Sequence, residues 1–293
     1  MGLRKEAIYL LMQEGLKRPF NGRIITLGKQ DIWITYKELK EIAAKANFSL
    51  RPLKKIELNE KEQMQSLGYI SDRTLFTSLG FEEIKSLDAS SYENADLIYD
   101  LNLSSLPREL QGGFDLVLDP GTIEHVFHVP NSLKNIYDLL RVGGRVIHIS
   151  PSSNHLDHGF YMFSPTLFWD YYTANQFDIS GLRIIQYQPQ PVFDWKIAEY
   201  VPGAFNAFSF GGLDQSMYAI YLIGTKTPHS THDKIPQQYN FSKNLWNQKG
   251  PTYRTSKLKE RIKKIRFLYK ISLFIYGAYK GRKLQRKFKN LVR

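Results

Sequence analysis

Short apolar runs alternate with amphipathic segments along the first 225 residues of the chain. Runs rich in leucine and β-branched residues predict strands at 23–27, 83–87, 96–99, 114–118, 145–149, 181–187 and 217–225. The segments between them carry apolar residues at helical spacing. Two of these segments have clear start signals, a capping box at Thr35 and Glu38 and a first-turn proline after Ser164. The alternation predicts an α/β fold with a doubly wound (Rossmann-like), seven-stranded, mostly parallel sheet that can end in an antiparallel hairpin.

Composition divides the chain into a domain, a linker and a tail. Residues 1–225 form the predicted domain, and within it residues 188–216 are rich in proline, glycine and aromatic side chains. That stretch predicts an irregular insertion on the acceptor side of a binding site. Residues 226–255 are polar and hold three prolines, as linkers do. Residues 256–293 predict a basic helical tail, because apolar residues recur at helical spacing among lysines and arginines.

The tail carries almost all of the net charge. It holds 14 of the 40 lysines and arginines and a single acid, so its net charge is +13 against +12 for the whole chain, and the rest sums to −1. A basic helix with an apolar stripe favours the surface of an anionic membrane. Packing of the stripe against the domain ranks second. Binding of nucleic acid along the basic residues ranks third.

The composition also excludes several kinds of chemistry. The chain has no cysteine, which rules out disulfides, thiolate metal sites and a cysteine nucleophile. No apolar run is long enough to span a bilayer, and the first 20 residues lack the apolar core of a secretory signal. We therefore expect a cytoplasmic protein, which the tail could bring to the inner face of the membrane. The oligomeric state stays open.

Candidate binding residues stand where the predicted strands end. Gly28 follows the first strand, and Asp88, Asp100 and Asp119 follow the next three central ones. In open α/β sheets, ligands bind at the carboxyl ends of the strands. A single acid in such a place is often only a helix cap. Three acids at successive strand ends favour a binding site.

Residues 114–153 add a more specific pattern. A strand ends in Asp119, an acid–histidine pair follows at Glu124 and His125, and an amphipathic helix leads through Gly143-Gly144 into another strand. This order resembles the second half of a class I S-adenosylmethionine-dependent methyltransferase, and the resemblance extends over residues 23–225. It implies methyltransferase activity with S-adenosylmethionine as the cofactor.

The resemblance also implies which residues contact that cofactor. The turn Leu27-Gly28-Lys29 would wrap its methionine moiety, and Asp88 would accept hydrogen bonds from both ribose hydroxyls. Asp100 with Leu101 would contact the adenine, and Asp119 with Gly121 would line the floor near the sulfonium.

The first turn departs from the family pattern, because it holds one glycine where several are usual. Dinucleotide binding needs those glycines so that the backbone can approach a pyrophosphate, which S-adenosylmethionine lacks. The turn therefore disfavours NAD. It also supports an alternative from another class, a non-catalytic Rossmann-like module that its basic tail recruits to membrane or nucleic acid.

Transfer of a methyl group to a hydroxyl requires positioning of the acceptor and a base for its proton. Five of the seven histidines lie between residues 125 and 158. We predict His125 or His158 as the catalytic base, with Asp157 or Glu124 as the carboxylate that orients it. Histidines beside carboxylates also suit zinc or iron, but the spacing fixes no geometry and no metal is expected.

Residues 158–168, HGFYMFSPTLF, resemble the region after the core of methyltransferases found with polysaccharide and surface-glycan biosynthesis. That resemblance implies a small-molecule, sugar or lipid-linked glycan acceptor, methylated on oxygen. A lipid-linked acceptor would connect the domain with a membrane-bound tail. An RNA methyltransferase is the remaining alternative, and it would bind RNA through the tail in a salt-sensitive manner.

Overall fold

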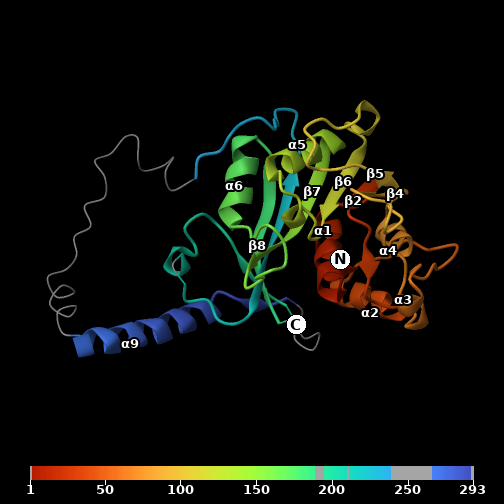
Figure 1. Cartoon of the computed structure of the whole chain (residues 1–293). Helices are drawn as coiled ribbons and strands as arrows, with labels where there is room; N and C mark the ends of the chain where they lie inside the picture. The colour runs from red at the N-terminus through yellow and green to blue at the C-terminus, as the bar shows by residue number, and fades with distance from the viewer. Residues whose placement is uncertain (1, 189–194, 210, 239–265, 292–293) are drawn as a thin grey trace.

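The computed structural model describes residues 2–188, 195–209, 211–238 and 266–291 of the 293-residue chain, with the backbone alone for 266–273 (Figure 1). Nine of the described strands form one large mixed sheet in the order β11-β9-β8-β10-β7-β6-β2-β4-β5. Five strands at one side of this sheet run parallel. They are β2 (Arg23–Leu27), β4 (Glu83–Asp88), β5 (Leu97–Ile98), β6 (Phe114–Asp119) and β7 (Leu140–Ser153).

The other side of the sheet is antiparallel. Strand β10 (Met217–Thr225) runs antiparallel between β7 and β8 (Asp178–Tyr187). Two short strands, β9 (Lys196–Glu199) and β11 (Lys289–Asn290), then extend the edge of β8. All seven predicted strands are present, but the prediction of a seven-stranded, mostly parallel sheet is wrong, because the described residues form a nine-stranded mixed sheet. The two extra strands pair along an open sheet edge and have no apolar run that would reveal them in the sequence.

Side chains of successive strand residues pack on opposite faces of the sheet. Ile25 of β2, for example, belongs to one core cluster and its neighbour Ile24 to the other. Helices α5 (Val129–Leu139) and α6 (Pro165–Ala174) cover the first face. The second face is covered by α1 (Lys5–Lys17), α2 (Tyr36–Ala46) and α4 (Asp72–Leu79). The doubly wound arrangement of helices is therefore confirmed.

Smaller elements complete the domain: α3 (Glu62–Ser66), the parallel pair β1 (Gly2–Leu3) and β3 (Asp31–Ile32), and the short 3-10 helices η1 (Arg108–Leu110), η2 (Ile123–His125) and η3 (Asn206–Phe208). The predicted capping box at the start of α2 is confirmed, since the Glu38 amide donates to Thr35 Oγ1 and the Thr35 amide donates to the Glu38 carboxylate. The Thr166 amide likewise donates to the Ser164 hydroxyl at the start of α6.

The predicted linker and tail both contact the domain where they are described. Lys226 is buried, and its Nζ donates to the carbonyls of Tyr137 and Leu140. The described tail is α9 (Arg266–Gln285) followed by β11, and the predicted helical residues 256–265 lie outside the described residues. After α9 the chain returns to the sheet (Figure 1). There the ring of Phe288 is centred 5.9 Å from that of Tyr218. No described helix combines the length and the apolar content that crossing a bilayer requires.

Candidate functional site

A cavity of about 250 Å³ opens at the carboxyl ends of β2 and β4, beside β5. Five residues predicted to contact a cofactor line it: Gly28, Lys29, Asp88, Asp100 and Leu101. Gln30, Glu93, Tyr99, Asn102, Thr122 and His125 contribute further polar groups to its walls. The ends of successive parallel strands thus meet at one edge of the sheet, as the strand-end pattern predicted.

The turn after β2 contains one glycine, and neighbouring side chains hold its conformation. Gly28 has a φ of +74°, and a Cβ at this position would lie 3.1 Å from Thr122 Oγ1. The Thr122 hydroxyl donates to the carbonyl of Leu27, and Gln30 Nε2 donates to the carbonyls of Leu27 and Gly28. Leu27 itself is fully buried beneath the turn. Gln30 and Thr122 therefore hold the turn, although the sequence analysis did not single them out. Their places beside Gly28 and Gly121 were the available signal.

Among the described residues, Asp88 and Asp100 each use one of their two carboxylate oxygens as a hydrogen-bond acceptor. Asp88 Oδ1 accepts from the Ser90 amide, and Asp100 Oδ1 accepts from the amide and side chain of Asn102. Neither acid caps a described helix, so the capping interpretation fails for both. In the part of the chain that the structure describes, the second oxygen of each acid accepts no hydrogen bond. Each acid therefore keeps an acceptor for a ligand in the cavity.

Lys29 lines the cavity, but its charge is already paired. Its Nζ lies 3.2 Å from Oδ2 of Asp72, the first residue of α4, and both side chains are largely buried. Since the ammonium is held by this carboxylate, the backbone of the turn is the part of Lys29 that remains for a ligand.

Asp119 lies beneath the cavities rather than on their walls. It is fully buried, and its Oδ1 accepts from the amides of Thr122 and Ile123 at 2.9 and 3.3 Å. Its Oδ2 lies 2.6 Å from Nδ1 of His148, whose Nε2 lies 2.6 Å from the Tyr172 hydroxyl. His148 is buried as well. Asp119 thus positions the turn that carries Glu124 and His125.

A second cavity of about 350 Å³ lies on the other side of that turn. Gly121 and Glu124 line this second cavity, whereas Thr122 and His125 line the first. The remaining walls come from the N-terminal segment, from the end of β7 and from aromatic side chains, and include Arg4, Ser150, His155, His158, Tyr187 and Trp195. Residues 120–126 therefore form a divider between the two cavities.

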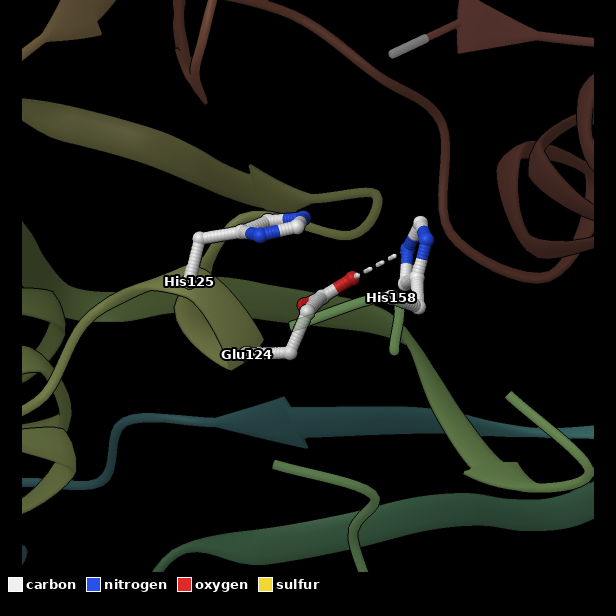
Figure 2. A group of neighbouring side chains, drawn as sticks. All are labelled: Glu124, His125 and His158. Carbon is white, nitrogen blue, oxygen red and sulfur yellow. Dashed lines mark ion pairs between the residues drawn. The ribbon is translucent and has the colours of Figure 1, made fainter. Parts of the chain in front are cut away.

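Two of the predicted catalytic residues meet at this divider. Glu124 is 1% exposed, and its Oε1 lies 3.7 Å from Nε2 of His158, with the two side chains pointing toward one another (Figure 2). The carbonyl of Glu124 accepts from the amides of Phe160 and Tyr161. A Cβ on Gly159 would lie 2.9 Å from that carbonyl oxygen, so glycine is required for this close approach. Burial, and then the charge of nearby Asp119, raise the pKa of Glu124 to about 8.

The third predicted catalytic residue, His125, lies beside them. Its ring is centred 5.1 Å from that of His158. Burial, followed by repulsion from His158, lowers the pKa of His125 below its usual value. Its imidazole is therefore neutral near pH 7, as a proton acceptor must be. Burial also lowers the pKa of His155, whose Nε2 lies 3.1 Å from the Tyr187 hydroxyl.

No model of a protein family matches the chain, and no curated protein matches its sequence. Solved structures do resemble its fold. The YcgJ protein of Bacillus subtilis overlaps with 75% of this chain and 98% of its own, at 12% identity and a TM-score of 0.41. A methyltransferase of Archaeoglobus fulgidus that depends on S-adenosylmethionine overlaps with 76% of this chain and 94% of its own, at 10% identity and a TM-score of 0.38.

A phosphoethanolamine N-methyltransferase of Haemonchus contortus, solved with S-adenosylhomocysteine, overlaps with 75% of this chain and 52% of its own. Its identity to this chain is 11% and the TM-score is 0.38. These overlaps are distant, so a function for this chain has to rest on its own residues.

Proposed function

We propose that this protein is an S-adenosylmethionine-dependent methyltransferase that transfers a methyl group to an oxygen of its acceptor. The observation that carries the proposal is the pair of cavities at the strand ends. The first is lined by Gly28, Asp88 and Asp100, and the second lies on the other side of the divider and is lined by Glu124. The strand order supports it, because antiparallel β10 separates β7 from β8, whereas a dinucleotide-binding sheet continues in parallel.

The residues of the first cavity fit the cofactor. Asp88 Oδ2 and Asp100 Oδ2 are acceptors without partners among the described residues, as ribose hydroxyls and an adenine amine require. The buried Oε1 of Gln30 also has no partner there, and it could accept from the ammonium of the methionine moiety. The cofactor, when bound, supplies an electrophilic methyl group on its sulfonium. Its adenosyl part would lie against Asp88 and Asp100, and its methyl group toward the divider.

The divider supplies the groups that handle the acceptor's proton. When bound, the cofactor would supply the methyl group that the acceptor oxygen takes, and the imidazole of His125 or His158 would accept the hydroxyl proton. Glu124, whose pKa of about 8 keeps it protonated at neutral pH, orients His158. Most of the acceleration would come from holding the acceptor in line with the methyl group.

For the acceptor we propose a small molecule with a sugar-like ring, or a lipid-linked glycan. Tyr187 and Trp195 line the second cavity with ring centres 5.6 Å apart, and aromatic faces of this kind stack on sugar rings.

Peripheral membrane contact has its support in α9, where four large side chains are exposed on a basic helix: Phe274, Ile275, Tyr276 and Tyr279. Sedimentation with anionic and with neutral lipid vesicles tests this contact. We expect the protein to sediment with the anionic vesicles alone.

Calorimetric titration with S-adenosylhomocysteine tests the proposed function. We expect saturable binding by the wild type. Asp88→Asn keeps the oxygen that accepts from the Ser90 amide but removes the charge and one acceptor, so binding should weaken about 10- to 100-fold. Asp178→Ala is the matched control, because Asp178 is exposed on β8 and lines neither cavity.

Two outcomes would overturn the proposal. The first is a folded protein that ignores S-adenosylhomocysteine, which would favour the non-catalytic module recruited by its tail. The second is saturable binding of NAD in the same cavity, shown by its loss in Asp88→Asn. Salt-sensitive binding of RNA by the full chain would instead redirect the search for an acceptor toward RNA.

A further inference from the structure

The side chains of Glu124, His125 and His158 converge at the divider between the two cavities (Figure 2). Each can offer one ligand atom, a carboxylate oxygen or an imidazole nitrogen, and these three atoms lie within 4.8 Å of one another. Glu124 comes from η2 and His158 from the loop after β7, so the chain folds back over more than thirty residues to bring them together. The hydrogen bonds from Phe160 and Tyr161 to the Glu124 carbonyl fix this approach.

A second observation points to a ligand at this place. Oε2 of Glu124 is buried and has no hydrogen-bond partner in the described part of the chain. An unpartnered carboxylate oxygen in a protein interior carries a desolvation cost that a cation would relieve. The neighbouring His155 lies outside this group of ligand atoms, and its Nε2 already contacts the Tyr187 hydroxyl.

We propose that Glu124, His125 and His158 form a binding site for a divalent transition-metal cation. Two imidazoles and one carboxylate are a ligand set typical of zinc and iron, whereas magnesium and calcium prefer oxygen ligands. Ligand atoms around such an ion lie about 3.4 Å apart, given bonds of about 2.1 Å in tetrahedral geometry. In the structure the ligand atoms lie within 4.8 Å of one another, and the two histidines are exposed, so their side chains can rotate to bring the ligand atoms closer together.

The position of the site indicates its purpose. Three protein ligands leave coordination positions open, and those positions would face the second cavity, which Glu124 and His158 line. A hydroxyl oxygen of the acceptor could occupy one of them and would thereby be held next to the first cavity. With the ion bound, Glu124 would be ionised and the ligating nitrogens of His125 and His158 could not accept the proton, so the ion would take over activation of the hydroxyl by lowering its pKa. This consequence rests on the proposed function, but binding of the cation does not.

Calorimetric titration with Zn²⁺, and visible absorption of the Co²⁺-loaded full-length protein, test the site in the absence of cofactor. We expect one ion per chain for the wild type and binding at least tenfold weaker in His158→Ala and in Glu124→Gln. His128→Ala is the matched control, because His128 is three residues from His125 but outside the cluster. Thermal unfolding of each variant establishes that it is folded.

Absence of saturable Zn²⁺ and Co²⁺ binding would overturn the inference. So would unchanged affinity in His158→Ala, equal loss in His128→Ala, or tighter binding of Mg²⁺ than of Zn²⁺. Titration with S-adenosylhomocysteine in the presence of EDTA separates the two proposals. Cofactor binding without metal binding would overturn the proposed cation site alone. Metal binding without cofactor binding would overturn the proposed methyltransferase function alone.

Discussion

The pKa of Glu124 makes a quantitative prediction about stability. This pKa is about 8 in the folded protein against 4.5 for an ordinary glutamate. Between these two pH values the folded state keeps a proton that the unfolded state releases, so stability falls as the pH rises, by at most about 1.4 kcal/mol per pH unit. Below pH 4.5 both states are protonated, and above pH 8 neither is. The total loss is on the order of 5 kcal/mol as an upper bound.

The variant Glu124→Gln isolates this contribution because glutamine cannot ionise. We expect the free energy of unfolding of the wild type, minus that of the variant, to decrease from pH 5 to pH 8 and to level off by pH 9. Urea unfolding followed by circular dichroism, with EDTA present, measures this difference. Glu109→Gln is the matched control, since Glu109 is exposed and makes no contact that the structure records, and its difference should stay flat.

A difference for Glu124→Gln that does not change between pH 5 and pH 8 would contradict this prediction. Such a result would mean that Glu124 is ionised in the folded protein at neutral pH. The buried Glu124 carboxylate would then carry its negative charge without the pairing or hydrogen bonding that a buried charge normally requires. A rise of this free-energy difference with pH would contradict the prediction more strongly. It would indicate a cationic partner that lowers the pKa of the Glu124 carboxyl.

Three further predictions concern the turn after β2 and two buried contacts. Gly28→Ala should weaken binding of S-adenosylhomocysteine at least tenfold in calorimetry, because the positive φ costs alanine about 1–2 kcal/mol and the new methyl group enters the cavity wall. Arg145→Met should destabilise the protein by about 3–5 kcal/mol in urea, because the variant leaves Glu14 buried without its partner at 2.8 Å. Tyr172→Phe should cost about 1–3 kcal/mol in the same assay by leaving Nε2 of His148 without a partner, while cofactor affinity stays unchanged.

The features that the sequence predicted well depend on local patterns. The capping box at Thr35 lies within four residues, and strand β10 is a single apolar run, so both were predicted correctly. Asp88 and Asp100 were placed at one cavity because carboxyl ends of parallel strands meet at one sheet edge. Each of these predictions needed only the residue order and a general rule of α/β folds.

The features that the sequence missed depend on contacts between distant residues. The resemblance places Asp119 on a cavity floor, whereas in the structure Asp119 is fully buried and contacts His148, 29 residues away. Strands β9 and β11 are short, and they form because the edge of β8 is open. The ion pair between Lys29 and Asp72 likewise joins two turns that no periodicity connects.

The divider offers a physical reason for the single glycine in the turn after β2. In-line methyl transfer depends on how firmly donor and acceptor are positioned. Here Asp119 holds the start of the divider through two backbone amides, and the backbone after His158 holds its end through the carbonyl of Glu124. Thr122, within the same divider, fixes the turn at Gly28. Because one rigid segment thus aligns both cavities, the turn needs glycine only at the position where Thr122 and Asp88 approach it, and further glycines would loosen it.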